Sequence, residues 1–220
     1  MRGRVKVLRG VSYLKQAIHE FKKILENPKL YLHTLTFWSW RGNPVSLEEY
    51  IEDVLKFVHL LHVQHLSFDI LSTKALLNIL PSLKPGYLTK ITIKIYLDEA
   101  TIGKLVEMDQ WKQAKHFDMS YNPFNGPLRH LYHSHEFTVS CWNLSVEDAR
   151  EMKEILLKSP DFKKCDLDVR SPIDPNLILQ VFGGPIEGSI DTCHYPTPNS
   201  TEYFEIFVNY YGIKIEKKKK

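Results

Sequence analysis

The feature that most constrains the fold is a spaced series of short apolar pairs. Six times in the chain, two large apolar residues are separated by a single residue, the period of two that is typical of a β-strand. The pairs are Leu35/Phe37, Leu66/Phe68, Ile91/Ile93, Phe117/Met119, Phe137/Val139 and Leu167/Val169. Their first members are 31, 25, 26, 20 and 30 residues apart. This interval is the length of one strand plus one helix, so it predicts a chain of strand-helix repeats.

Helical patterns fill most of the intervals between these pairs. The clearest covers residues 46–61, where Ser46 and Glu49 form a capping box ahead of an apolar stripe with helical spacing. Residues 145–158 repeat this design. Weaker helical patterns cover residues 13–26, 72–80, 98–113 and 174–182. Only the interval that begins after Met119 is too short, and too rich in proline and glycine, for a full helix.

The alternation within the strands predicts how the sheet is covered. Strands that are buried on both faces are nearly continuous apolar runs. Here the residues beside the apolar pairs are polar, as at Thr36, Ser67 and Asp118, so one face should pack on helices and the other should meet solvent or a partner. This order of elements predicts an α/β fold, a curved, leucine-rich-repeat-like array of parallel strands with helices on one face. Only Phe117-x-Met119-x-x-Asn122 resembles the L-x-L-x-x-N core of such repeats, so we expect no asparagine ladder.

The end of the chain has a different pattern. Residues 190–195, 203–210 and 213–215 have strand character, and Gly212 permits a turn between the last two. A small antiparallel meander should therefore close the array and act as its cap. The sequence accordingly divides into a basic N-terminal segment at residues 1–12, a repeat domain at 13–216 and a lysine tail at 217–220.

The net charge is concentrated at the two ends of the chain. The formal charge is +3 and the isoelectric point about 8.6, but eight cations lie at the termini: Arg2, Arg4, Lys6, Arg9 and the four lysines at 217–220. Without them, 21 basic residues face 26 acidic ones, so the body carries a charge of −5. An acidic body repels phosphates, which argues against nucleic-acid binding by the folded part. We expect the terminal lysines to form a solvated tail.

No pattern in the sequence predicts a catalytic residue, a cofactor or a metal ligand. Nucleophile-elbow, phosphate-loop and dinucleotide-binding motifs are absent from the sequence. It also contains no signal peptide and no apolar stretch approaching about 18 residues, so we expect a cytoplasmic or nuclear protein that does not bind membranes. Cys141, Cys165 and Cys193 are widely spaced and odd in number, which predicts reduced thiols.

Two groups of three histidines are candidate metal ligands: His59, His62 and His65, and His130, His133 and His135. The first group runs from a predicted helix into a strand, which points its rings in different directions, so we interpret both groups as packing or surface residues. Asp166 and Asp168 share the open face of one strand, but no partner acid or base accompanies them, and we assign no catalysis there.

The open face of the sheet is the predicted binding surface. If the apolar pairs point toward the helices, alternation directs polar and aromatic side chains outward. Aromatic residues and arginine dominate interface hot spots, so this mixture predicts a partner-binding patch. The patch comprises Thr36, Trp38, Ser67, Asp69, Lys94, Tyr96, Asp118, Ser140, Trp142, Asp166, Asp168 and Arg170, with Trp40 beside it. The alternative is that Trp38, Trp40 and Trp142 lie at strand ends and pack under loops.

Five segments, in this order, resemble the FTH domain of nematode F-box-type proteins. They are residues 17–32 (AIHEFKKILENPKLYL), 79–93 (ILPSLKPGYLTKITI), 108–115 (MDQWKQAK), 155–162 (ILLKSPDF) and 198–206 (PNSTEYFEI). The physics of these motifs is structural: Pro81 and Pro85 stop a helix, and Gly86 permits a turn. Trp111 is expected to anchor the following helix to the sheet.

The resemblance implies a protein-protein interaction module, the partner-binding half of a ubiquitin-ligase adaptor. In such adaptors an F-box docks onto the ligase through a Skp-type linker protein. Residues 1–12 show no F-box pattern, so we expect this chain to bind a protein partner of unknown identity but no Skp-type linker by itself. Two alternatives stay open: a nucleic-acid-associated adaptor that uses its basic ends, and a cryptic hydrolase with a deep pocket around a titratable group.

Overall fold

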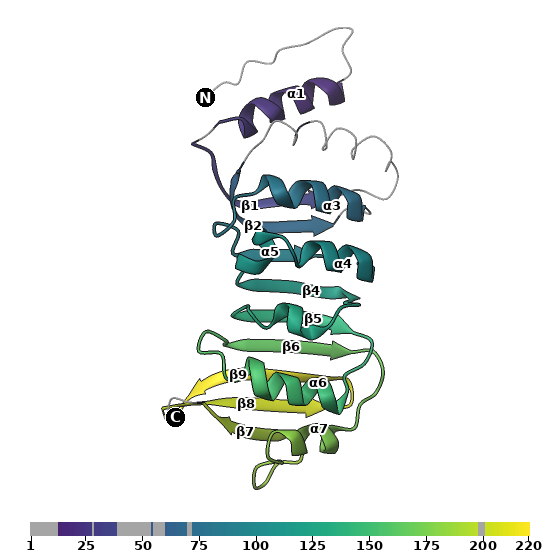
Figure 1. Cartoon of the computed structure of the whole chain (residues 1–220), viewed down its shortest axis with the longest axis vertical. Coiled ribbons are helices and arrows are strands. Elements are labelled where there is room, and N and C mark those ends of the chain that lie inside the picture. The colour runs from purple at the N-terminus through teal and green to yellow at the C-terminus, as the bar shows by residue number, and fades with distance from the viewer. Residues whose placement is uncertain (1–12, 28, 39–53, 55–59, 70–71, 198–200) are drawn as a thin grey trace, which may run out of the picture.

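A computed structural model describes residues 13–27, 29–38, 54, 60–69, 72–197 and 201–220. Over these residues the chain forms one nine-stranded sheet with the order β1-β2-β3-β4-β5-β6-β9-β8-β7 (Figure 1). Strands β1 to β6 are parallel and follow one another in space as they do in sequence. Strands β9, β8 and β7 continue the sheet in antiparallel pairs. The fold is therefore a mixed α/β fold that ends in an antiparallel meander.

The strands lie where the sequence predicted them. The parallel strands are β1 (Tyr31–Trp38), β2 (His62–Asp69), β3 (Lys90–Ile93), β4 (His116–Pro123), β5 (Glu136–Cys141) and β6 (Lys164–Val169), and each contains one of the six apolar pairs. The meander consists of β7 (Thr192–Pro196), β8 (Glu202–Asn209) and β9 (Gly212–Lys219). Because β9 continues through Lys219, most of the lysines assigned to a tail are paired with β8 in the sheet.

The described helices are α1 (Tyr13–Leu25), α3 (Thr73–Ile79), α4 (Glu99–Leu105), α5 (Asp109–Gln113), α6 (Val146–Glu151) and α7 (Pro175–Val181). None of them is long and apolar enough to cross a membrane. The helix predicted at 46–61 lies outside the described residues except at 54, 60 and 61. The interval after Met119 holds only one short 3-10 helix, Leu128–Leu131.

One helix prediction was wrong. Residues 98–113 do not form a single helix, because the backbone at Met108 is extended (φ −75°, ψ 139°) and separates α4 from α5. The break lets α5 place Trp111 in the core, where the residue is 1% exposed and its ring centroid lies 4.6 Å from that of Phe117. Tertiary packing of one large aromatic side chain therefore overrides the local helical pattern.

Helix starts follow from local sequence. Ser72, Asp98 and Asp174 each accept a hydrogen bond from a backbone N–H of the first turn, which satisfies a donor that the helix itself leaves free. Ser145 and Asp148 form a full capping box at α6.

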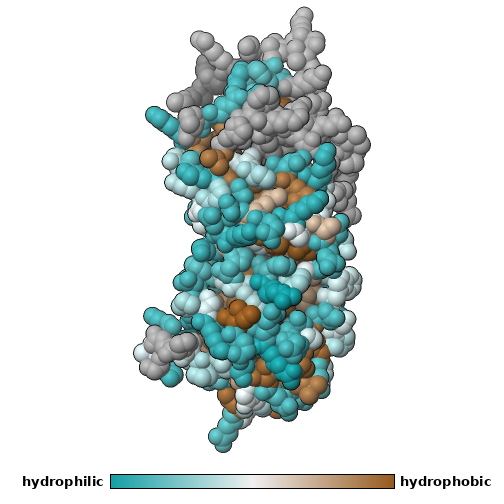
Figure 2. Space-filling model, in the orientation of Figure 1, coloured by the Kyte–Doolittle hydropathy of each residue, from teal (hydrophilic) through white to brown (hydrophobic). Residues whose placement is uncertain are grey.

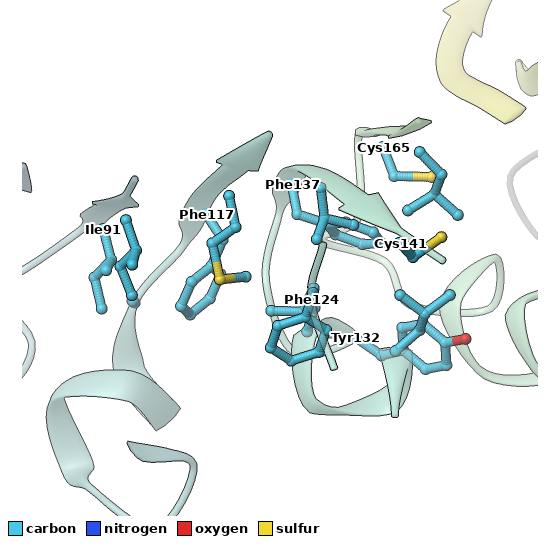
Figure 3. Packing of buried hydrophobic residues seen from close by; sticks show 14 of the residues in the cluster. Ile91, Phe117, Phe124, Tyr132, Phe137, Cys141 and Cys165 are labelled. Atoms are coloured by element: carbon cyan, nitrogen blue, oxygen red, sulfur yellow. The ribbon is translucent and has the colours of Figure 1, made fainter. Parts of the chain in front are cut away.

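A single row of buried side chains crosses all nine strands. Its members are paired in register and are each 8% exposed or less: Leu35, Leu66, Ile91, Phe117, Phe137, Cys165, Ile215, Ile206 and Cys193. Figure 3 shows the central part of this row, one side chain from each neighbouring strand, with Phe124 and Tyr132 packed below it. Helices α3 to α7 lie on one side of the sheet, whereas α1 lies beyond the β1 edge (Figure 1). Hydrophilic residues dominate the surface seen from the side of the helices (Figure 2).

Two of the sequence motifs pack on each other. The Gln110 side-chain amide donates to the Leu83 carbonyl at 2.8 Å and to the Pro81 carbonyl at 3.4 Å. Gly86 has φ +78°, and a Cβ there would lie 3.1 Å from the Gln113 amide oxygen. Segments 79–93 and 108–115 therefore pack against each other. Trp111 anchors α5 to the sheet, as the sequence predicted.

Candidate partner-binding surface

The open face of the sheet carries a continuous row of mostly polar side chains. In register across the nine strands this row is Thr36, Ser67, Thr92, Asp118, Thr138, Asp166, Lys214, Phe207 and Thr192. It alternates with the buried apolar row, so it lies on the face opposite the helices in Figure 1. The predicted alternation of covered and open faces is therefore present in the structure.

Exposed aromatic residues lie along the edge of the sheet that is formed by the carboxyl ends of the parallel strands. Five of them are Trp38 (59% exposed), Tyr96 (55%), Tyr121 (61%), Trp142 (55%) and Tyr211 (61%), and Tyr210 (64%) lies beside Tyr211. The first four lie in or just after β1, β3, β4 and β5, and the fifth lies in the turn between β8 and β9. We call these five residues the aromatic edge. Carboxyl ends of parallel strands share one edge of a sheet, which is why residues so far apart in sequence gather there.

Asparagine side chains hold part of the aromatic edge in place. Trp142 Nε1 donates to Asn125 Oδ1 at 3.0 Å, and the Asn125 amide donates to the Leu97 carbonyl at the same distance. Asn122, the residue that matched the leucine-rich-repeat pattern, donates to the Lys94 carbonyl at 2.8 Å. The Lys94 ammonium in turn lies 4.9 Å from the ring centroid of Tyr121. These contacts orient the aromatic rings before any partner binds, which lowers the entropy cost of binding.

A shallow pocket of about 240 Å³ lies on the open face where β6 meets β9. Its lining residues include Asp166, Asp168, Phe207, Tyr211, Gly212 and Lys214. A Cβ at Gly212 would lie only 2.3 Å from the Leu167 carbonyl oxygen, so glycine alone allows β9 to approach β6 this closely. The pocket therefore extends the aromatic edge across the junction between the parallel and antiparallel halves.

Most of the predicted patch lies on the open face, with one error. Thr36, Asp69, Asp168 and Arg170 are exposed, as are Trp38, Tyr96 and Trp142, whereas Ser67, Lys94, Asp118 and Asp166 are half-buried. Ser140 is fully buried, because Arg170 covers it and donates to its hydroxyl at 3.0 Å. Trp38 and Trp142, the described members of the alternative in which tryptophans pack under loops, are each more than half exposed. Trp40 lies outside the described residues.

Sequence reasoning missed three aromatic residues of this surface. Tyr121 lies where the pairing of β4 with β5 shifts between Met119 and Pro123, so alternation no longer indicates its face. Tyr211 lies in a turn, where no periodicity applies. Phe207 had a usable signal, because it lies between the inward-facing Ile206 and Val208.

The histidines considered as metal ligands have packing contacts instead. His62 Nε2 lies 3.1 Å from Lys84 Nζ, and its ring packs edge-on against Tyr87. His65 Nε2 lies 3.0 Å from Thr92 Oγ1, and partial burial lowers the pKa of His65. His59 lies outside the described residues. In the part of the chain that the structure describes, no three His, Cys, Asp or Glu side chains are grouped as a metal site.

The three cysteines are free thiols, as predicted, and all are buried. Burial raises the pKa of Cys193 to about 11 and that of Cys141 to about 12, and it also raises the pKa of Cys165. Thiols held in this state are poor nucleophiles.

Comparison with known proteins supports the sequence resemblance. The model of the FTH domain family matches residues 46–186. The chain is also 24% identical over 182 residues to F-box A protein 224 of Caenorhabditis elegans. That alignment covers 80% of this chain and 47% of the relative, so the chain spans about half the length of the curated relative it matches. No solved structure matches.

Proposed function

Because the chain belongs to the FTH domain family, we propose that it is a protein-interaction domain that binds its partner through the open face of the sheet. The observation that carries this proposal is the aromatic edge, five exposed aromatic residues on one edge. Aromatic side chains combine a large contact area with few rotatable bonds, which is why they form most binding hot spots. The polar residues of the neighbouring row would form the rim of such an interface.

A finer proposal concerns the role of this binding. The matching relative is named an F-box protein, and an F-box-associated family is expected to select a protein partner. We infer that the domain supplies partner selection in an adaptor of a ubiquitin ligase. The stepwise parallel order of β1 to β6 also supports a leucine-rich-repeat-like array, in which each strand-helix unit adds one segment of binding surface.

The proposal is tested by affinity capture with single alanine variants. The wild-type protein is immobilised and incubated with an extract of the source cells. It is expected to retain one protein in stoichiometric amount. Trp142→Ala and Tyr96→Ala should each weaken that complex by about 2 kcal/mol, roughly 30-fold, because hot-spot aromatics cost this much when truncated. Tyr87→Ala is the control, since Tyr87 is an exposed aromatic residue just before β3, at the opposite end of the strands.

Thermal unfolding of each variant separates binding from folding. Alanine at an exposed position should change the free energy of unfolding by less than about 1 kcal/mol, whereas alanine at a core position would lower it by several kcal/mol. Equal capture by all variants, or unfolding of both edge variants, would contradict the proposed surface. Recovery of RNA with a strongly salt-dependent affinity would favour the nucleic-acid alternative.

A further inference from the structure

The opposite edge of the sheet, where β4, β5 and β6 begin and β9 ends, carries a row of basic residues. The backbone N–H of His135 donates to the Lys115 carbonyl, that of Lys163 to the His135 carbonyl and that of Lys217 to the Lys163 carbonyl, each at 2.8 Å. These four residues therefore stand side by side on neighbouring strands, about 4.8 Å apart at each step. We call Lys115, His135, Lys163 and Lys217 the basic rim.

The positive charges of the lysines at this edge are only weakly neutralised by nearby carboxylates. Within the described ranges, no carboxylate lies within 4.0 Å of the ammonium group of Lys115 or Lys163, or of Lys90 and Lys164 in the adjacent row. Lys217 donates to the Pro160 carbonyl at 2.9 Å, and its ammonium lies 5.4 Å from the ring centroid of Phe204, so its charge is held in place.

Two of the nearby acids already contact basic side chains. A carboxylate oxygen of Glu136 lies 3.6 Å from His116 Nδ1, and one of Glu216 lies 2.7 Å from Lys218 Nζ. Burial lowers the pKa of His135, and the positive charges of Lys115, Lys163 and His116 lower it further against the opposing effect of Asp161. The surroundings of His135 therefore oppose an added positive charge, as expected where cations outnumber the acids that face them.

We propose that the basic rim binds an acidic segment of a partner protein, a short run of aspartate and glutamate side chains. This goes beyond the proposed function, because the rim and the aromatic edge lie at opposite ends of the strands. Three steps of about 4.8 Å give the rim a length of roughly 14 Å, which a few residues of extended peptide can span.

The charges beyond the rim distinguish a peptide from a nucleic acid. Next to β9, strand β8 contributes Glu202 and Glu205 to the same half of the sheet. A phosphate backbone is a continuous line of negative charge, so a strand that follows the rim would be repelled by these carboxylates. A peptide can confine its acids to the length of the rim.

Fluorescence anisotropy with a labelled peptide of six consecutive glutamates tests this inference on the whole chain in 50 mM salt. The wild-type protein should bind the peptide, and the affinity should fall as salt increases. The double variant Lys115→Glu and Lys163→Glu should weaken binding by about tenfold or more, because two attractive contacts become repulsive. Its matched control, Lys104→Glu with Arg150→Glu, makes the same change in net charge on exposed helix positions and should bind within about twofold of wild type.

The experiment can either support or overturn the proposed peptide site. Absence of peptide binding by wild type, equal binding by the rim variant, or equal loss in the control would overturn the proposal. Tighter binding of a labelled oligouridine than of the peptide would replace it with a nucleic-acid site. If the glutamate variant does not fold, Lys115→Gln with Lys163→Gln removes the charge without reversing it and should still lose affinity. Trp142→Ala should leave peptide binding unchanged, which separates this site from the aromatic edge.

Discussion

Replacing Gly212 by alanine tests the junction that holds the two halves of the sheet together. Gly212 is buried, and its added Cβ would lie 2.3 Å from the Leu167 carbonyl oxygen, whereas real Cβ atoms essentially never approach within 3.0 Å. Strand β9 would have to move by roughly 0.7 Å, and it is paired with β6 on one side and β8 on the other. The obstacle is backbone, so no side chain can rotate away to relieve it.

We expect this substitution to lower the free energy of unfolding by about 2–3 kcal/mol. Overpacking costs about 1–3 kcal/mol, and the stiff obstacle places this case near the upper end, even after the gain of up to about 1 kcal/mol from the less flexible unfolded chain. For a chain of this length the melting temperature should fall by about 5–10 °C. Urea unfolding followed by circular dichroism would give the free energy directly.

Gly103→Ala is the matched control. Gly103 lies inside α4, it is exposed, and an added methyl group would meet no atom within 4 Å. Alanine should therefore stabilise the protein there by about 0.5–1 kcal/mol. If Gly212→Ala is as stable as wild type, or if the two variants shift stability in the same direction, the close approach of β9 to β6 is refuted.

Three further predictions concern buried groups. The Tyr132 hydroxyl is buried with no hydrogen-bond partner among the described residues, so Tyr132→Phe should leave the free energy of unfolding unchanged or raise it by up to about 1 kcal/mol in urea titrations; a clear loss would reveal a hidden partner. Cys141, Cys165 and Cys193 should resist a thiol reagent at pH 8 in the native state and all react in denaturant, whereas fast native labelling would contradict their burial. Because the pKa of His65 is lowered below its ordinary value of 6.5, the folded state binds fewer protons than the unfolded state, and stability should fall as the pH drops below about 6.5. Denaturation of wild type and His65→Gln at pH 7.5 and 5.5 checks this, and an equal pH dependence in both would contradict it.

Local sequence determined the elements and their faces. The period of two at Leu66/Phe68 or Phe137/Val139 identifies a strand and its buried side without reference to any neighbour. Caps such as Ser145 act within one helical turn, so α6 could be predicted in the same way. The outward position of Tyr96 and Trp142 follows from the same alternation, which is why much of the candidate surface could be predicted.

The neighbours of each strand were decided only by tertiary structure. Periodicity states which way a side chain points but not which strand lies beside it, so no pattern placed β9 between β6 and β8. Lys115 and Lys217 are brought onto one rim by hydrogen bonds that link four strands. Tertiary structure also decides the exposure of two other side chains. A register shift exposes Tyr121, and the neighbouring Arg170 buries Ser140. Each of these features depends on pairing between distant segments, whose free energy comes from packing of the whole sheet and is not encoded in any local window.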